Sequence, residues 1–184
     1  MKSFFKFMIW IILLVGGIGV SVYLDRNLLH FERLDGSILY YIILGLGSML
    51  FVTAFFSTGN VGRTLAKHGR KAKDLPRMQT DQLVTTGIYA MMRHPMHQTL
   101  MQFPMAIALM IVSPSFIFIV APLEILLIYI LIRTIEEPDA RKKFGKAYDD
   151  YCATTPRFCF KWKCLKALTR NPDHDWLNKE SNQS

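Results

Sequence analysis

Three long stretches without charged side chains constrain this chain more than any other feature of its sequence. Residues 7–24 and 36–62 contain no Lys, Arg, Asp or Glu, and residues 98–132 contain only Glu124. A helix needs about 20 predominantly apolar residues to cross the hydrocarbon core of a membrane, because each residue advances the helix by about 1.5 Å. The sequence therefore predicts an all-α, polytopic integral membrane protein.

The third stretch is too long for one span, since a straight helix over residues 98–132 would measure about 52 Å. Ser113, Pro114 and Ser115 lie near its middle, and such residues favour a turn. We predict two antiparallel helices, over 95–112 and 116–134, that form a hairpin. The chain then has four transmembrane helices, and this even number places both termini on one side of the membrane.

Lys and Arg residues indicate which side that is. Lys2 and Lys6 precede the first span, and the loop over 25–35 carries two basic against three acidic residues. Eleven basic residues follow from position 133 onward. The second loop holds seven basic residues: Arg63, Lys67, Arg70, Lys71, Lys73, Arg77 and Arg93. Because Lys and Arg accumulate in cytoplasmic loops, both termini are predicted to be cytoplasmic, at the cell inner membrane if the source is a bacterium.

The formal net charge of +8 is interpreted as this topology together with attraction to anionic lipid. Nucleic-acid binding is disfavoured, because no folded basic domain remains outside the spans. The first span is expected to be retained rather than cleaved as a signal peptide, since no small-x-small cleavage site follows it.

The three cysteines, Cys152, Cys159 and Cys164, all lie in the segment predicted to be cytoplasmic. The cytosol keeps thiols reduced, and spacings of seven and five residues fit no zinc pattern. We therefore expect ordinary thiols and no metal site. No strand–glycine-rich-loop–helix unit is present either, which excludes a Rossmann-type nucleotide site.

The chain is predicted to fold as a single membrane-embedded domain over 1–166, with a polar, mobile tail over 167–184. Its soluble parts are a cytoplasmic loop, over 63–93, and a C-terminal helical segment that is rich in helix formers over 136–151.

One cluster of polar groups stands at the start of the third predicted helix. Arg93, His94 and His97 surround Pro95, and proline is favoured at the first position of a helix. A helix N-terminus carries partial positive charge and binds anions. The alternative interpretation is a basic cluster that only anchors the helix at the level of the lipid headgroups.

A second cluster stands where the fourth predicted helix leaves the membrane. Arg133, Glu136 and Glu137 occupy positions i, i+3 and i+4, so a regular helix places them on one face. The predicted hairpin brings this cluster close to the first one, and together they can grip a zwitterion such as an amino acid. The alternative is an exposed ion pair that contributes little.

Glu124 is the one ionisable residue inside the fourth predicted span. Such residues normally face the interior of a helix bundle and often serve function. By helical angle it points nearly opposite to Arg133. A structural and a functional role are equally supported by the sequence.

Two motifs in this chain resemble those of the isoprenylcysteine carboxyl methyltransferase family, over roughly residues 83–160. The first is Leu83-Val84-Thr85-Thr86-Gly87-Ile88-Tyr89 followed by Arg93-His94-Pro95-Met96. The second is Glu136-Glu137, Phe144-Gly145, Tyr148, Tyr151 and Pro156-Arg157-Phe158. Phospholipid methyltransferases and membrane thiol methyltransferases share this core, so the resemblance indicates the superfamily more than the substrate.

The resemblance implies a membrane methyltransferase that uses S-adenosyl-L-methionine, held at the cytoplasmic edge. Glu136 would bind the amino group of the cofactor, and Arg133 would orient an anionic group of the acceptor. If the acceptor is an amine or a thiol, a base is also needed, and Glu137 and His97 are the candidates. The implied cofactor contacts are Gln82, Leu83, Val84, Tyr89, His94, Pro95, Met96, His97 and Glu136.

The acceptor is left open by the sequence. An isoprenylcysteine-like carboxylate, a phospholipid amine and a small thiol all remain, and the expected partners are the bilayer and this lipophilic or small acceptor. Two alternative functions also remain: a membrane NADPH-dependent reductase of the sterol-reductase type, and a non-enzymatic membrane subunit. The oligomeric state is not indicated.

Overall fold

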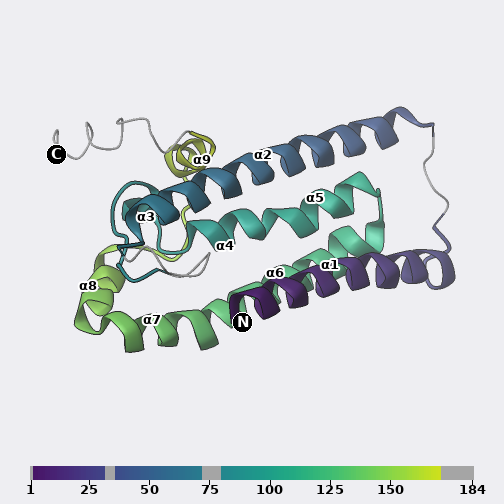
Figure 1. Ribbon diagram of the computed structural model, residues 1–184. Helices are drawn as coiled ribbons and strands as arrows, with labels where there is room; N and C mark the ends of the chain where they lie inside the picture. Colours follow the sequence, from purple (N-terminus) through teal and green to yellow (C-terminus); the bar gives the residue numbers. More distant parts are fainter. Residues whose placement is uncertain (1, 32–35, 72–79, 171–184) are drawn as a thin grey trace. The chain divides into compact units, whose positions relative to one another are not determined.

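The computed structural model describes residues 2–31, 36–71 and 80–170, and all its regular elements are helices (Figure 1). The all-α prediction is therefore confirmed for this part of the chain, whereas residues 171–184 of the predicted mobile tail lie outside the described residues. The elements are α1 (Lys2–Asn27), α2 (Ile38–His68), α3 (Ile88–Met91), α4 (Pro95–Leu100), α5 (Gln102–Met110), the π-helical η1 (Phe116–Val120), α6 (Ala121–Leu131), the π-helical η2 (Ile132–Glu136), α7 (Glu137–Phe144), α8 (Lys146–Thr154) and α9 (Trp162–Thr169).

Three helical stretches among the described residues are long and apolar enough to cross a membrane. They are Trp10–Asn27 in α1, the whole of α2, and the continuous run Phe116–Phe144. Many of the large apolar side chains of α2 point outward, and Tyr41, for example, is 61% exposed. Lipid contact accounts for such exposure, because an apolar side chain loses nothing in a hydrocarbon environment.

The predicted third span is interrupted. Instead of one helix over 95–112, the chain forms α4 and α5, which are separated at Met101. Pro104 supplies the reason, because it has no N–H to donate to the carbonyl of Leu100 and its ring crowds that carbonyl. The four-span arrangement is thus not confirmed by the fold and stays a prediction.

The chain divides into two compact units, each built from two separate parts of the sequence. Unit 1 comprises Met1–Ala54 and Met101–Leu131, and unit 2 comprises Phe55–Leu100 and Ile132–Ser184. The core of unit 1 lies where α5 packs against η1 and α6, around the buried residues Ala108, Phe116, Val120 and Ala121.

The chain reverses direction between α5 and η1 close to the predicted turn. α5 ends at Met110, and the helical backbone resumes at Pro114. Asp25, which is 8% exposed, accepts hydrogen bonds from Ser113 Oγ (2.5 Å) and from the Ser115 N–H (2.9 Å). A residue expected in a loop is therefore a buried acceptor that fixes this turn.

Glu124 packs against a glycine of α1 within unit 1. A Cβ atom on Gly17 would overlap Glu124 Oε1 and would come within 2.9 Å of Val120 Cγ1. Small residues permit this close approach of helices. Glu124 Oε1 is buried without a hydrogen-bond partner among the described residues, so the structure shows a packing position, and a functional role stays a prediction.

Unit 2 is organised by the chain segment that follows α8. The N–H groups of Arg93 and His94 donate to the carbonyl oxygens of Pro156 (2.9 Å) and Arg157 (3.1 Å). The Gln98 side chain donates to the carbonyl of Cys159 (2.8 Å) and accepts from its N–H (3.0 Å). These four bonds fasten the segment over 156–159 to the beginning of α4.

Helix α9 contributes the remaining residues to the core of unit 2. Asn60 of α2 donates to the carbonyl of Leu168 (3.3 Å). The core residues are Val61, Val84, Ile88, Tyr89, Met92, Cys159, Cys164, Ala167 and Leu168. The boundary that was predicted at residue 166 falls inside α9, and the prediction of a single domain over 1–166 stays a prediction.

The prediction of three ordinary thiols is wrong for two of the cysteines. Cys159 and Cys164 form a disulfide, with their Cα atoms 5.9 Å apart. Gln98 fixes the backbone at Cys159, and the extended backbone of Lys161 leads directly into α9, which returns the chain to that point. Spacing alone did not reveal this return. Cys152 on α8 is a free, half-buried thiol.

Candidate functional site

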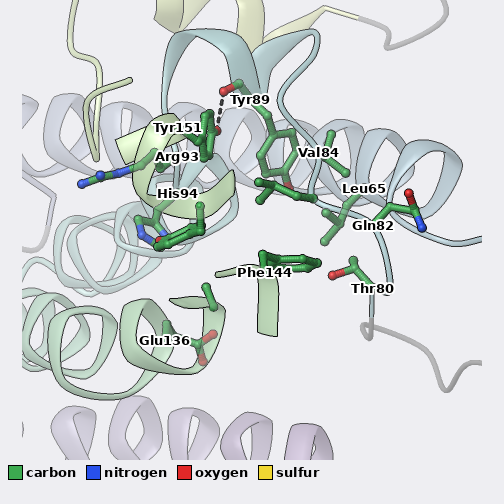
Figure 2. Close-up of a pocket in the computed structure, with 13 residues that line it drawn as sticks. Leu65, Thr80, Gln82, Val84, Tyr89, Arg93, His94, Glu136, Phe144 and Tyr151 are labelled. Atoms are coloured by element: carbon green, nitrogen blue, oxygen red, sulfur yellow. Dashed lines mark hydrogen bonds between the residues drawn. The ribbon is translucent and has the colours of Figure 1, made fainter. Parts of the chain in front are cut away.

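A pocket in unit 2 collects most of the predicted site residues (Figure 2). It contains about 510 Å³ of space, its opening to solvent included. Its thirteen lining residues are Leu65, Thr80, Gln82, Leu83, Val84, Tyr89, Arg93, His94, Glu136, Ala140, Phe144, Tyr148 and Tyr151.

Six of the nine expected cofactor contacts line this pocket. They are Gln82, Leu83, Val84, Tyr89, His94 and Glu136. The other three, Pro95, Met96 and His97, do not line it. Pro95 is the first residue of α4, as predicted, but α4 has only six residues, and the N–H groups just before it are bonded to the segment over 156–159.

Several lining residues were not assigned to the site from the sequence. Nothing in the sequence indicated Leu65 and Thr80 as site residues, because only the tertiary fold brings them to the pocket. A signal did exist for Phe144, Tyr148 and Tyr151, which belong to the second resembled motif. Their spacings of four and three residues predict that the three side chains share one face of a regular helix.

The loop that carries Gln82 is closed by a glycine. The carbonyl of Gly69 accepts from the N–H groups of Asp81 (2.9 Å) and Gln82 (3.3 Å), and Asp81 Oδ1 accepts from the Lys71 N–H (2.7 Å). A Cβ atom on Gly69 would lie 2.7 Å from both the Leu65 carbonyl oxygen and Thr80 Cγ2. Only glycine allows this closure, which places residues 80–84 at the pocket.

Buried polar atoms without partners gather at the pocket. Tyr89 Oη and Arg93 Nε are buried there without a hydrogen-bond partner in the described structure. His94 Nε2 and Tyr148 Oη are also buried and make no hydrogen bond of good geometry, although His94 Nε2 lies 3.5 Å from Glu137 Oε1. Because buried polar groups are nearly always satisfied in native proteins, these atoms are candidate contacts for a polar ligand.

The phenols of the pocket are neutral at physiological pH. Burial, with the neighbouring Tyr151 as a smaller cause, raises the pKa of Tyr89 well above its usual range. Burial also raises the pKa of Tyr148 to about 12. Tyr151 donates its hydroxyl to the backbone carbonyl of Tyr89 (Figure 2), which fixes the orientation of the Tyr151 ring. The pocket therefore offers hydroxyl groups, not phenolates, to a ligand.

His94 is a neutral imidazole over the physiological range. Burial is the main cause that lowers its pKa to about 4, and nearby His97 acts in the same direction, whereas Glu137 opposes the shift and Arg93 adds to it. A neutral ring can donate or accept a hydrogen bond at Nε2, depending on its tautomer.

Glu137 does not line the pocket but lies buried beside it, with 2% exposure. Arg157 donates from Nε to Oε1 and from NH2 to Oε2, both at 2.9 Å. Arg93 NH2 lies 3.0 Å and His94 Nε2 lies 3.5 Å from Oε1. Glu137 is thus the shared counter-ion of two arginines that come from distant parts of the sequence.

The prediction that Arg133, Glu136 and Glu137 share one helical face is wrong. Arg133 is exposed, Glu136 is half-buried at the pocket, and Glu137 is buried. The cause is η2, since a π-helical turn closes its hydrogen bonds from i to i+5 and shifts the register that a regular α-helix would have.

Comparison with known families decides between the predicted functions. The phospholipid methyltransferase family matches residues 42–147, which is more than half of the 184 residues. The chain belongs to the phospholipid methyltransferase family. This family includes the isoprenylcysteine carboxyl methyltransferases, so the resemblance seen in the sequence is confirmed. Comparisons with curated proteins and with solved structures found no match.

The match to phospholipid methyltransferases includes every lining residue of the pocket except Tyr148 and Tyr151. The family consists of membrane-bound enzymes that transfer methyl groups. Membership therefore supports methyl transfer at a membrane, and it favours this function over a reductase or a non-enzymatic subunit.

The ion pairs of Glu137 predict that substitutions at two adjacent residues, Glu137 and Glu136, change the stability of the protein by different amounts. Glu137→Gln leaves the charges of Arg93 and Arg157 without a counter-ion, so we expect the free energy of unfolding to fall by about 3 kcal/mol or more. Glu136→Gln is the matched control, and we expect it to change that free energy by less than about 1 kcal/mol. Denaturant unfolding of the detergent-solubilised protein measures both, and equal small losses would contradict the assignment.

The lowered pKa of His94 predicts that the protein loses stability as the pH falls. The pKa of this histidine in the folded state, about 4, lies below the ordinary value of 6.5. The unfolded chain therefore binds a proton first as the pH falls. The contribution of neutral His94 is complete above pH 6.5 and is lost toward pH 4, by up to about 3 kcal/mol.

Unfolding measured between pH 7 and pH 4 tests this expectation. His94→Gln should flatten the decline in the free energy of unfolding, whereas His68→Asn, which alters an exposed histidine of α2, should retain the parent profile. An unchanged decline in His94→Gln would show that other groups cause it.

Proposed function

We propose that this protein is an integral membrane methyltransferase that binds S-adenosyl-L-methionine in the pocket of unit 2 and methylates a lipophilic acceptor. The observation that carries the proposal is the coincidence of the family match with a pocket that holds unpartnered, buried polar atoms. Among the acceptors that the sequence left open, membership of this family favours a phospholipid amine.

The side chains of the pocket offer groups that complement the polarity of this cofactor. In the view of Figure 2, Glu136 and His94 lie toward one end and Thr80 and Gln82 toward the other, with Phe144 between them. Glu136 would hold the ammonium of the amino-acid end, and the neutral His94 and Tyr89 would donate hydrogen bonds to its polar atoms. Leu83, Val84 and Phe144 would contact the adenine ring, as apolar side chains do in most ligand sites.

The cofactor would supply a methyl group already activated on a sulfonium. The residues of the chain then need mainly to hold two reactants in line, and such positioning can contribute about 7–11 kcal/mol. Arg133, which is exposed on η2, would orient an anionic group of the acceptor such as a phosphate.

An amine acceptor also needs a base within reach. Of the two candidates, Glu137 is occupied by Arg93 and Arg157, so we assign it a positioning role and leave His97 as the candidate base. Pro95 and Met96 would act by placing His94 and His97 at the start of α4.

We further propose that α4 and α5 together form the remaining span, which gives four spans with both termini in the cytoplasm. The basic residues of the second loop and of the C-terminal part support this orientation. The cofactor would then enter from the cytosol, and the acceptor would enter from the lipid.

The proposal predicts that Glu136 governs cofactor affinity. In Glu136→Gln, the ammonium of a bound cofactor loses its counter-ion, so we expect the affinity for S-adenosylhomocysteine to fall roughly a hundredfold. Asp139→Asn, which removes an equal charge from an exposed position of α7, should bind like the parent. Calorimetric titration measures this difference, and parent-like affinity in Glu136→Gln would remove Glu136 from the site.

Methyl transfer itself is tested with a labelled cofactor. Purified protein is incubated with S-adenosylmethionine labelled in its methyl group and with fractionated membrane lipids or small thiols. We expect label in an amine-containing phospholipid, and none with Glu136→Gln. Label in no fraction, although the cofactor binds, would overturn the proposed acceptor class, and no binding at millimolar concentration would overturn the proposed function.

A further inference from the structure

Two large aromatic side chains stand exposed at the beginning of α9. Phe160 is 75% exposed and Trp162 is 78% exposed. They flank Lys161, whose extended backbone precedes the helix. Single exposed apolar residues are common on proteins, but two large exposed aromatic residues that flank a lysine mark a candidate binding surface.

The other side of α9 is buried. Cys164, Ala167 and Leu168 occupy positions i, i+3 and i+4 and belong to the core of unit 2. At about 100° per residue, Trp162 and Lys166 fall on the opposite side of the helix. Helix α9 is therefore fixed to the unit by one face and presents an aromatic and basic face outward.

This outward face is positively charged. Residues 155–170 contain five basic and no acidic residues. Arg157 is bound to Glu137, and the other four are exposed: Lys161, Lys163, Lys166 and Arg170. A partner that complements this face must offer both negative charge and an apolar layer.

We propose that residues 160–170 form a docking surface for anionic lipid headgroups. Phe160 and Trp162 enter the interfacial layer, where amphipathic aromatic side chains are favoured. Lys161 and Lys166 contact the lipid phosphates, and each lysine near an anionic surface contributes about a fivefold factor to binding.

The docking surface also bears on the pocket of unit 2. The buried face of α9 belongs to the same core as Val84 and Tyr89, which line that pocket. Docking of α9 therefore holds the pocket-bearing unit against the headgroups. This surface does not depend on the proposed methyl transfer, because it needs neither the cofactor nor an acceptor.

The proposal is tested in a variant whose single remaining tryptophan is Trp162. The full chain with Trp10→Phe and Trp176→Phe is reconstituted in nanodiscs of phosphatidylcholine alone, or of phosphatidylcholine mixed with phosphatidylglycerol. Lipids brominated close to the headgroup then quench the fluorescence of any tryptophan at that depth. We expect quenching of Trp162 that rises with the content of phosphatidylglycerol.

Two matched double variants locate the charge that matters. Lys161→Gln with Lys166→Gln should lower the ratio of docked to undocked α9 by about 25-fold, and thus weaken the dependence on phosphatidylglycerol. Lys142→Gln with Lys146→Gln removes the same charge from exposed positions of α7 and α8, and it should behave like the parent. Circular dichroism verifies that each variant retains its helical content.

Some outcomes would overturn the proposal. Trp162 quenching that is absent, or equal in neutral and anionic nanodiscs, would show that anionic lipid does not bind this face. Equal effects of the two double variants would show that overall charge acts rather than α9. Because none of these readings uses cofactor or activity, they separate this proposal from the proposed function.

Discussion

The carboxylate of Glu137 connects three parts of the chain that lie far apart in sequence. It begins α7, and it accepts from Arg93, which precedes α4, and from Arg157, which follows α8. The side chains of Glu137 and Arg93 are both buried, so either of them without its partner would be an unpaired buried charge. The position of His94 at the pocket depends on this arrangement, as does the path of the segment over 156–159.

Hydrogen bonds of the backbone join the same two segments as the ion pairs of Glu137. Arg93 and His94 donate to the carbonyls of Pro156 and Arg157, and Gln98 holds both polar groups of Cys159. These bonds hold the two family motifs together, although the first ends at Met96 and the second begins at Glu136. One wall of the pocket comes from the residues before α4, and the other comes from α7 and α8. Glu136 lines the pocket, whereas its neighbour Glu137 binds Arg93 and Arg157 beside it.

The sequence predicted those features that follow from local pattern. Uncharged runs predicted α1 and α2, and the resemblance to a known family implied that Gln82, Tyr89, His94 and Glu136 belong to one site. It failed where one residue or a distant contact overrides the pattern. Pro104 interrupts the third span, the π-helical η2 replaces regular α-helix over Ile132–Glu136, and the return of α9 joins Cys159 to Cys164. Hydrophobic periodicity assumes an unbroken α-helix and contains no information about such contacts.

The central claim is that the segments over 80–94 and 136–151 together form the cofactor pocket. Amide hydrogen exchange with and without S-adenosylhomocysteine tests this claim most directly. A ligand that binds the folded state slows the opening of the segments that hold it. The account predicts slower exchange over residues 80–94 and 136–151, and no change over 10–27 of α1. Unchanged exchange in both pocket segments, at a concentration of ligand that saturates the protein, would contradict it.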